Sequence, residues 1–439
     1  MIFMKNLKKI KILCLFIACI IILSCVNISA SDISDTPFVC ACGENCICVD
    51  SDEICGKCDN CECRKDSEVF EETKEKVKES PGITIVQPEL GIKAEGAILM
   101  EAATGIILYE QNADKALPPA SVTKIMSLLL IMEGIAEGRI SLDDKVITSE
   151  YASSMGGSQV YLEAGEEMSL HDMLKAIVVA SGNDATVAVA EHLMGSVDAF
   201  VARMNERAKE LGMENSVFKN TTGLDEDGHV TSARDIAIMS RELLKHQKIF
   251  DYTRIWMDTL RNGEFGISNT NRLIRFYSGA TGLKTGSTGI AKYCLSASAE
   301  RNGMHLIAVV MAAPSSDERF AGSKKLLDYG FATYAVYKIP QEEIAPVRVT
   351  GGVNQFVKAS HETESFLINK GKEKNIEKQI QISESVAAPI EKGQKIGTIN
   401  YTIDGIVVKT VNITASEQIE RISFWGIFGK MAKKYFLMG

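Results

Sequence analysis

The sequence predicts an α+β domain of about 250 residues, followed by a small all-β domain. Two hairpin patterns, near 97–110 and 293–312, enclose a region in which apolar residues recur at helical spacing. Beyond residue 340 the helical periodicity stops, and short alternating runs broken by glycine and proline replace it. A chain of 439 residues has room for two or three domains of this kind.

The composition excludes several classes of protein. With 46% apolar and 24% charged residues, the chain is neither wholly disordered, nor a collagen-like fibre, nor a many-pass membrane protein. A formal net charge of −9 leaves no electrostatic footprint for nucleic acid, so we expect no nucleic-acid partner. Six histidines in all argue against a histidine-rich metal site or a histidine-based triad.

Residues 1–30 have the pattern of an export signal. Lysines come first, an apolar run of 12 residues follows over 12–23, and small residues lead to Ala30. This run is shorter than the roughly 20 residues that a membrane-spanning helix needs. Cleavage after Ala30, retention as an uncleaved anchor, and acylation of Cys25 in a sequence that resembles a lipoprotein lipobox all stay open. In each case the chain leaves the cytoplasm.

Residues 31–92 are predicted to be a cysteine-rich segment and a charged linker. Eight cysteines lie between Cys40 and Cys63, in C-x-C and C-x-x-C spacings that suit a soft metal. In an oxidising compartment the same cysteines form disulfides, and the sequence does not separate the two interpretations. We expect no catalytic role for the cluster, and a solvated tether over 64–92.

The α+β domain is expected over residues 93–340 and the small β-rich domain over 341–415. In the first domain we predict a hairpin of 97–102 with 105–110 and a second hairpin of 293–298 with 306–312, which has Asn-Gly turn chemistry. Between the two hairpins we predict helices over 121–137, 170–194 and 197–211, and after them a closing helix over 316–335. In the second domain the alternating runs lie at 345–349, 380–382, 395–401 and 405–413.

The first chemical motif is Ser121-Val-Thr-Lys124, which follows two prolines. Prolines favour a helix start here, so Ser121 is expected in the first turn with Lys124 on the same face. A lysine that is partly buried near other positive charge has a lowered pKa and can take the serine proton. The pair is therefore a candidate nucleophile and base, although a solvated helix end would have the same spacing.

Two further motifs follow along the chain. Ser181-Gly-Asn183 puts a hydroxyl and an amide on a short turn, where they can relay a proton and orient a substrate amide; the alternative is a helix N-cap. Lys284-Thr285-Gly286 leads into the second hairpin, which predicts an edge strand. A cation and a hydroxyl there can hold a carboxylate, and Gly286 leaves room for an extended peptide to pair with the strand.

The order S-x-x-K, S-x-N, K-T-G is shared by penicillin-binding proteins and class A β-lactamases. The chain resembles the low-molecular-mass penicillin-binding proteins that are serine-type D-alanyl-D-alanine carboxypeptidases of peptidase family S11. Other stretches that resemble this family lie at 97–114, 218–224, 231–235, 269–273 and 388–397. The resemblance covers roughly residues 90–439, and the cysteine-rich segment has no counterpart in it.

The resemblance implies a β-lactamase/transpeptidase-like domain, with an antiparallel sheet flanked by helices, that needs no cofactor and no metal. It implies Ser121 as the acylated nucleophile, Lys124 as its general base and Ser181 as the group that passes the proton to the leaving D-alanine. The implied substrate is a peptidoglycan stem peptide ending in D-Ala-D-Ala, with β-lactams as inhibitors. The remaining implied residues bind substrate: Asn183 its amide, Lys284 and Thr285 with Gly286 its carboxylate end, Ser121 and Ser287 its carbonyl oxygen through their backbone N–H groups, and Arg319 as an auxiliary on the carboxylate side.

Three rival functions fit the sequence less well. A class A β-lactamase has aspartate where Gly182 stands, and a glutamate about 36 residues beyond the motif, where this chain has Lys219. A transpeptidase on the same fold often has larger accompanying domains. The third alternative is a non-enzymatic surface protein that binds metal or adheres through its cysteine segment, but the intact Ser121, Lys124, Ser181 and Lys284 argue against it.

Residues 416–439 are predicted to form an amphipathic membrane-association helix. Apolar residues, Phe424 and Phe428 among them, recur at helical spacing, and Lys430, Lys433 and Lys434 fall on the opposite face. The alternative is a terminal helix packed on the protein's own core. Together with the export signal, this helix predicts a protein at the extracytoplasmic face of the bacterial cell membrane.

Overall fold

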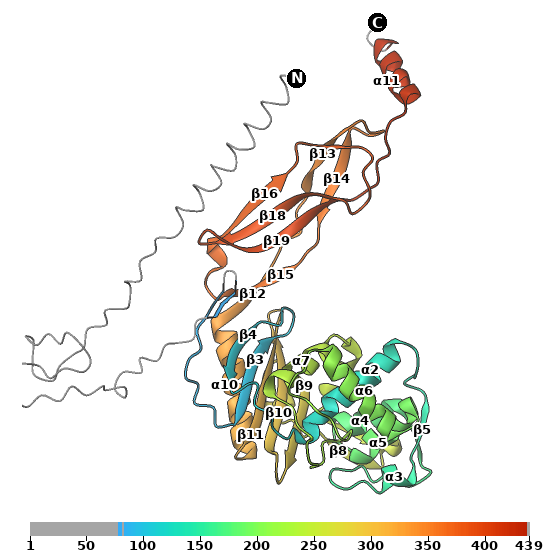
Figure 1. The fold of residues 1–439 in the computed structure, drawn as a ribbon, viewed down its shortest axis with the longest axis vertical. Coiled ribbons are helices and arrows are strands. Elements are labelled where there is room, and N and C mark those ends of the chain that lie inside the picture. Colours follow the sequence, from blue (N-terminus) through green and yellow to red (C-terminus); the bar gives the residue numbers. More distant parts are fainter. Residues whose placement is uncertain (1–77, 81–82, 437–439) are drawn as a thin grey trace, which may run out of the picture. The chain divides into compact units, whose positions relative to one another are not determined.

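The computed structural model describes residues 78–80 and 83–436 (Figure 1). The predicted export signal, the Cys40–Cys63 cluster and the first part of the charged linker lie outside these described residues.

The α+β domain is built on a five-stranded antiparallel sheet in the order β4-β3-β11-β10-β9. Both predicted hairpins are confirmed, and Asn302 and Gly303 turn the second with φ of 53° and 80°. Strand β9, which carries the K-T-G motif, lies at the edge of the sheet, as predicted. The strands are β3 (Gly96–Glu101), β4 (Ile107–Gln111), β9 (Ala280–Thr288), β10 (Lys292–Arg301) and β11 (Met304–Ala313).

The sheet is covered on both faces, as Figure 1 shows. On β11, Leu306, Ala308 and Val310 pack against α10 (Ser316–Thr333), while the alternate residues Ile307 and Val309 face the helical lobe. Side chains alternate between the two faces of a strand, so a strand buried on both sides has an almost unbroken apolar sequence.

The helical lobe lies between β4 and β9 in the sequence. The predicted helical stretch 170–194 is two helices, since the chain turns at 179–182 with Ser181 in the left-handed region at φ 63°. A further helix, α7, was not predicted. The lobe contains η1 (Ala120–Thr123), α2 (Lys124–Ala136), β5 (Lys145–Ile147), α3 (Glu150–Ser153), β6 (Glu167–Ser169), α4 (Leu170–Val178), α5 (Asn183–Met194), α6 (Val197–Glu210), α7 (Ala233–Leu244), η2 (Gln247–Ile249), α8 (Phe250–Thr253), β7 (Met257–Leu260), η3 (Arg261–Gly263), β8 (Phe265–Ser268) and α9 (Leu273–Phe276).

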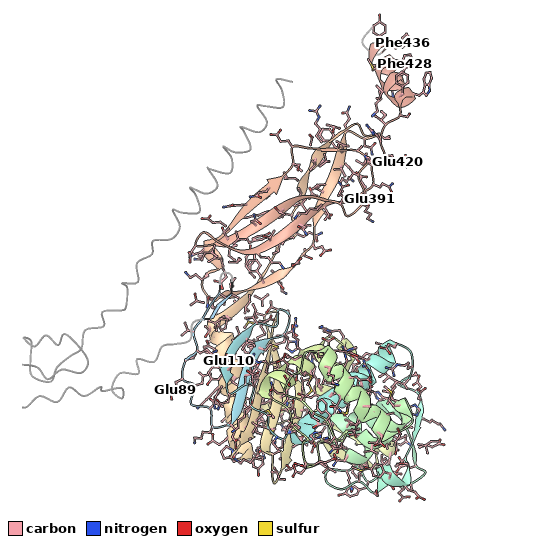
Figure 2. The ribbon with its side chains drawn as sticks, viewed as in Figure 1. Glu89, Glu110, Glu391, Glu420, Phe428 and Phe436 are labelled. Atoms are coloured by element: carbon pink, nitrogen blue, oxygen red, sulfur yellow. The ribbon has the colours of Figure 1, made fainter. Side chains whose placement is uncertain are left out.

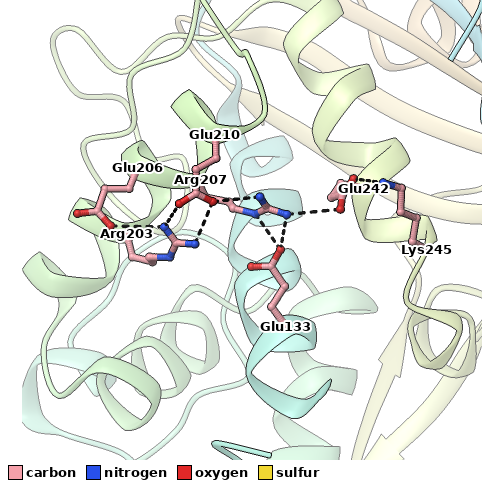
Figure 3. Close-up of polar contacts among 7 residues, drawn as sticks. All are labelled: Glu133, Arg203, Glu206, Arg207, Glu210, Glu242 and Lys245. Carbon is pink, nitrogen blue, oxygen red and sulfur yellow. Dashed lines mark hydrogen bonds and ion pairs between the residues drawn. The ribbon is translucent and has the colours of Figure 1, made fainter. Parts of the chain in front are cut away.

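Helix α2 is the centre of this lobe and is buried along almost its whole length. Its apolar residues join one core cluster with those of α4, α5 and α7. An ion-pair network fixes its far end: Arg207 of α6 contacts Glu133 of α2 at 2.8 Å and Glu242 of α7 at 3.4 Å (Figure 3). The network therefore ties α2, which begins at the S-x-x-K motif, to two other helices.

We expect Arg207→Leu to destabilise the domain, because it leaves the largely buried carboxylate of Glu133 without its cation and leaves Glu242 with Lys245 alone. Removing one partner of a largely buried pair costs about 1–3 kcal/mol, which lowers the melting temperature of a domain of this size by roughly 3–8 °C. Arg203 is the matched control, since it pairs only with residues of its own helix and its side chain is 30% exposed, against 18% for Arg207. Thermal unfolding checks this, and equal melting temperatures for the two variants would contradict the role given to the network.

The second domain is all-β, as predicted. Its main sheet has six strands in the order β16-β18-β19-β14-β13-β17, and β12 pairs with β15. Residues 334–335 were predicted as the end of a helix, but they begin β12, because helix α10 ends at Thr333 and the chain goes on to pair with β15. The strands are β12 (Tyr334–Lys338), β13 (Ile344–Thr350), β14 (Phe356–His361), β15 (Ser365–Asn369), β16 (Ile376–Ile382), β17 (Ser385–Ala387), β18 (Lys395–Ile403) and β19 (Ile406–Ala415), with η4 at Glu373–Asn375.

Two predicted boundaries are wrong. The linker was expected to stay solvated up to residue 92, but β1 (Lys78–Ser80) pairs with β2 (Ile83–Ile85), and Ile83 and Ile85 are buried in the core beside α10. At the other end, residues 416–422 were assigned to the terminal helix, but Ile419 is buried in the β-domain and bridges Ile390. In both cases a few apolar residues in a mostly polar segment, Ile83 and Ile85 or Ile419, are buried in the neighbouring domain and extend it beyond the predicted boundary.

The C-terminal helix α11 covers Phe424–Phe436. Its side chains Phe424, Trp425, Phe428 and Met431 are exposed, so they are not packed on the protein's own core. Among the helices that the structure describes, none has by itself the length and hydropathy to cross a membrane. Helices α5 and α6 meet that test only as a pair, bent by 85°.

Candidate active site

The S-x-x-K motif forms the start of α2, as predicted. Pro118 and Pro119 lead into the single 3₁₀ turn η1, and α2 continues directly from it at Lys124. Ala120 has a positive φ of 49°, an uncommon conformation for a residue with a side chain. Ser121, which follows it, is half-buried.

Lys124 is completely buried, and its amine has three oxygen neighbours. Nζ lies 3.0 Å from Ser121 Oγ, 2.6 Å from Asn183 Oδ1 and 3.0 Å from the backbone oxygen of Thr222. None of these three groups is a carboxylate, so no hydrogen-bonded counter-ion offsets burial of the charged amine. The structure thus joins the first two motifs through one amine.

Burial holds the pKa of Lys124 well below its usual range, and the positive charge of Lys284 lowers it further. The carboxylate of Asp184 acts in the opposite direction but is the weakest of the three influences. Asp184 also accepts hydrogen bonds from the backbone N–H groups of Val160 and Leu162, which occupy its oxygens. A lowered pKa favours the neutral amine, which is the form that a general base requires.

The loop 220–223 is a part of the site that sequence reasoning missed. Asn220 Oδ1 accepts hydrogen bonds from the backbone N–H groups of Thr222 and Gly223, at 3.2 and 2.7 Å, and so orients the carbonyl that Lys124 meets. Gly223 has a φ of 86°, and a Cβ there would lie 1.8 Å from the backbone oxygen of Ala120. The available signals in the sequence were Asn220 and Gly223, which lie in the stretch 218–224 that resembles the family.

A buried histidine supports the same loop. The backbone N–H of Lys219 donates to Nδ1 of His229 at 3.0 Å, and Nε2 lies 2.8 Å from Oγ1 of Thr123. Because Nδ1 accepts, the neutral ring carries its proton on Nε2 and donates to Thr123. Burial lowers the pKa of His229 to about 4, so the ring is neutral at physiological pH. It has a positioning role behind the helix start.

The second and third motifs meet in another amine–hydroxyl pair. Lys284 Nζ donates to Ser181 Oγ at 2.8 Å and to the backbone oxygen of Thr285 at 3.1 Å. Ser181 is buried and sits in a left-handed conformation, a backbone strain of the kind found at functional turns. Burial, and to a lesser extent the charge of Arg319, lower the pKa of Lys284 to about 7.

Thr285 points to a residue that was not predicted as part of the site. Its hydroxyl donates to Oγ1 of Thr270 at 2.7 Å. Thr270 is exposed, whereas its neighbours Asn269 and Asn271 are buried and hydrogen-bonded to backbone groups. The loop therefore holds one exposed hydroxyl beside Thr285.

Gly286 is needed for the packing of η1 on β9, a role that the sequence did not predict. A Cβ at this position would lie 2.9 Å from each of three backbone atoms: the oxygen of Pro119 and the nitrogens of Ser121 and Val122. Its absence lets η1 pack directly on the edge strand. The glycine thus brings the motif with the serine against the motif with the lysine and threonine, and Ser287 follows it as an exposed residue.

Gly286→Ala is expected to slow, roughly 100-fold, the acylation of Ser121 that the family resemblance implies, because β9 must move away from Ser121 by some tenths of an ångström or more. Gly289→Ala is the matched control, since a Cβ at Gly289 meets nothing within 4 Å. Acylation by a fluorescent penicillin, followed in time, checks this. Equal rates for the two variants would show that the close packing at Gly286 does not matter.

The remaining predicted residues are held in place as follows. Asn183, at the start of α5, donates from Nδ2 to the backbone oxygen of Gly156 at 2.7 Å, which fixes its amide and turns Oδ1 towards Lys124. Arg319 is buried and donates to the backbone oxygens of Gly286 and Cys294, at 3.1 and 3.4 Å. Two of its hydrogen bonds therefore hold the backbone of β9 and β10, a third reaches Ser316 Oγ at 3.5 Å, and its charge acts on Lys284.

Comparisons with known proteins show which family this chain belongs to. Residues 83–315 match the D-alanyl-D-alanine carboxypeptidase family, peptidase S11, and residues 331–421 match the penicillin-binding protein 5 C-terminal domain. The chain is 47% identical to D-alanyl-D-alanine carboxypeptidase DacF of Bacillus subtilis, over 76% of this chain and 88% of that protein. It is 34% identical to D-alanyl-D-alanine carboxypeptidase DacC of Escherichia coli, over 76% of this chain and 86% of that protein.

The fold agrees with these matches. A structure of penicillin-binding protein 5 from Haemophilus influenzae superposes with a TM-score of 0.66 at 32% identity, and it covers 77% of this chain and all of that one. The α+β domain and the β-domain are thus both accounted for. The chain belongs to the peptidase S11 family of serine-type D-alanyl-D-alanine carboxypeptidases, with the C-terminal domain of the penicillin-binding protein 5 type.

Proposed function

We propose that this protein removes the terminal D-alanine from peptidoglycan stem peptides that end in D-Ala-D-Ala, through an acyl-enzyme on Ser121. The observation that supports it most directly is the Lys124 amine, buried within 3.0 Å of Ser121 Oγ with no carboxylate among its hydrogen-bond partners. A neutral amine there can accept the serine proton as Oγ attacks the carbonyl of the penultimate D-alanine.

The rest of the site is assigned to binding and proton transfer. Lys284 and Thr285 hold the terminal carboxylate, and Asn183 binds the substrate amide. The backbone N–H groups of Ser121 and Ser287 form the oxyanion hole.

The leaving group departs through the second amine–hydroxyl pair. As the C–N bond breaks, Ser181, hydrogen-bonded to Lys284, passes its proton to the amine nitrogen, and the last D-alanine leaves. The proton that Lys124 took from Ser121 goes back to Ser181, so Lys124 is neutral again. Lys124 then takes a proton from the water that attacks the ester and gives it to Oγ as the Ser121 Oγ–carbonyl bond breaks. β-Lactams acylate the same hydroxyl, and because no part leaves the site they are expected to stay bound as inhibitors.

An end-point assay separates this function from its rivals. We expect one D-alanine to be released per peptide ending in D-Ala-D-Ala, while a chromogenic cephalosporin is consumed only to about one equivalent per enzyme. Rapid, continuing hydrolysis of the cephalosporin would instead identify a β-lactamase. If an added amino-acid acceptor captures most of the acyl group, the enzyme is a transpeptidase.

The two lysines predict a bell-shaped pH profile of kcat/KM for a D-Ala-D-Ala peptide. Lys124 acts only when neutral, so activity rises with pH through its lowered pKa; Lys284 binds the carboxylate only when charged, so activity falls above its pKa of about 7. A peptide ending in an amide has no carboxylate and should lose the alkaline limb. A profile for the acid peptide that stays flat from pH 6 to 10 would contradict these assignments.

We further propose that the enzyme works at the extracytoplasmic face of the cell membrane, with α11 lying in the membrane surface. Exposed aromatic side chains on α11 and basic residues between them suit the interface of an anionic bilayer. Vesicle binding that is lost when Trp425 and Phe428 are both replaced by serine would support this. Unchanged binding of that double variant would exclude α11 as the anchor.

A further inference from the structure

Two exposed apolar side chains lie at the turn between β13 and β14. Val353 is 48% exposed and Phe356 is 55% exposed. No charged residue lies between Arg348 and Lys358. Gly352 lets this turn fold tightly, since a Cβ there would lie 2.7 Å from Cγ1 of Val349.

The turn is hydrogen-bonded to the segment that leads into α11. The backbone N–H of Val353 donates to the oxygen of Glu420, and the N–H of Ile422 donates to the oxygen of Gly351, both at 2.9 Å. Lys430, on the second turn of α11, donates from Nζ to the backbone oxygen of Val353 at 2.6 Å. The turn and the first part of α11 are therefore held together.

Helix α11 presents a similar surface. Figure 2 shows Phe428 and Phe436 on this helix and Glu420 on the segment before it. Phe428 is 60% exposed, and Phe424 and Trp425 are more exposed still. The turn and α11 thus both expose apolar side chains, on two segments that hydrogen bonds hold together.

Charge favours an anionic bilayer as the occupant of this surface. Residues 348–358 and 420–436 together carry six basic residues and one acidic residue, Glu420. In a chain with a net charge of −9, these two segments are a local reversal of sign. Apolar side chains flanked by cations are the pattern of an interfacial membrane contact.

We propose that the turn 351–356 is a second membrane contact, which inserts Val353 and Phe356 into the interface beside α11. The inference rests on the proposed membrane association of α11 and adds to it. A single helix on a flexible lead would leave the domain free to turn, whereas two contacts joined by hydrogen bonds fix which end of the β-domain faces the bilayer.

The β-domain offers a matched control at the turn between β18 and β19. Ile406 and Val407 are 59% and 46% exposed there, as much as the residues of the proposed contact. That turn instead carries Asp404, which pairs with Lys372. Strand β19 runs from Ile406 to Ala415, which pairs with β14, so the two turns are roughly 30 Å or more apart at about 3.3 Å per residue.

The first test is partition of the full chain onto vesicles of phosphatidylcholine with phosphatidylglycerol. We expect Phe356→Ser to weaken partition roughly tenfold and Ile406→Ser to leave it unchanged, because only Phe356 loses a contact with lipid. D-Alanine release from a soluble peptide and the melting temperature should be unchanged in both variants, which shows that each folds.

The second test locates the side chain directly. A tryptophan introduced as Phe356→Trp should be quenched by brominated lipid beyond the quenching seen for the wild type, and one introduced as Ile406→Trp should not. If wild-type protein binds vesicles and Phe356→Ser binds equally well, the turn is not a contact, although α11 still is. If the wild type itself does not bind, the proposed membrane association fails and this inference falls with it.

Discussion

Replacing Ser121 by alanine is expected to lower kcat/KM for D-alanine release by about 10⁴-fold or more. The variant removes the only atom that forms the proposed acyl-enzyme, and what remains is catalysis by binding and by oxyanion-hole contacts. Initial rates of D-alanine release from a D-Ala-D-Ala peptide measure the effect. The variant leaves in place the residues proposed to bind substrate, Asn183, Lys284 and Thr285, so the peptide should still bind.

Ser127→Ala is the control for this variant. Ser127 lies on the same helix and is buried, and its hydroxyl donates to the backbone oxygen of Thr221 at 2.7 Å. Its loss should cost about 1 kcal/mol of stability and leave the turnover rate nearly unchanged. Substantial activity in Ser121→Ala, or a loss of equal size in Ser127→Ala, would remove Ser121 from the mechanism.

The second large effect is expected from Lys124→Met, which should lower the rate of acylation about 10³-fold. A general base contributes about 10²–10⁴-fold, and methionine fills the volume without offering a proton acceptor. Asn183 Oδ1 and the oxygen of Thr222 each lose a donor, so stability should fall by about 1–3 kcal/mol as well. Rapid-mixing kinetics with a fluorescent penicillin separate the acylation rate from this loss of stability.

Lys145→Met controls for removal of a lysine, since Lys145 is exposed and pairs only with Glu167. Ser181→Ala is the informative comparison, because Ser181 is the other group able to take the first proton. If Ser181→Ala slows acylation far more than Lys124→Met does, the base is the Ser181–Lys284 pair. In that case the role proposed for Lys124 is wrong.

The sequence predicted those parts of the fold that local chemistry determines. The Asn-Gly turn located the β10–β11 hairpin, and the proline pair located the start of α2. Helix α7 was missed although its cap was readable: Ser232 accepts from the backbone N–H of Asp235, an N-cap pattern that stood in a stretch noted only as family-like.

Other errors came from contacts between distant segments. The N-terminal linker was read as solvated, because nothing near Ile83 and Ile85 in the sequence shows that they would pack beside α10. The first two residues of β12, Tyr334 and Ala335, were predicted as helix, because the partner strand β15 lies some 30 residues away. Strand pairing of this kind is decided by tertiary structure and not by local propensity.

For the active site, the three motifs gave the residues but not the connections between them. The spacing of Ser121 and Lys124 predicted that they share a helix face, and in the structure Lys124 Nζ lies 3.0 Å from Ser121 Oγ. It gave no sign that Lys124 would contact Asn183, or that Lys284 would contact Ser181. It also gave no sign that Gly286 makes room for η1.

The most direct test of the central claim is intact-protein mass spectrometry of the wild-type chain treated with benzylpenicillin, followed by peptide mapping. The account predicts one adduct of the mass of the whole antibiotic, long-lived, on the peptide that contains Ser121. An adduct on any other residue, or no adduct from a chain that still releases D-alanine, would contradict the claim that a serine activated by a buried lysine does the chemistry.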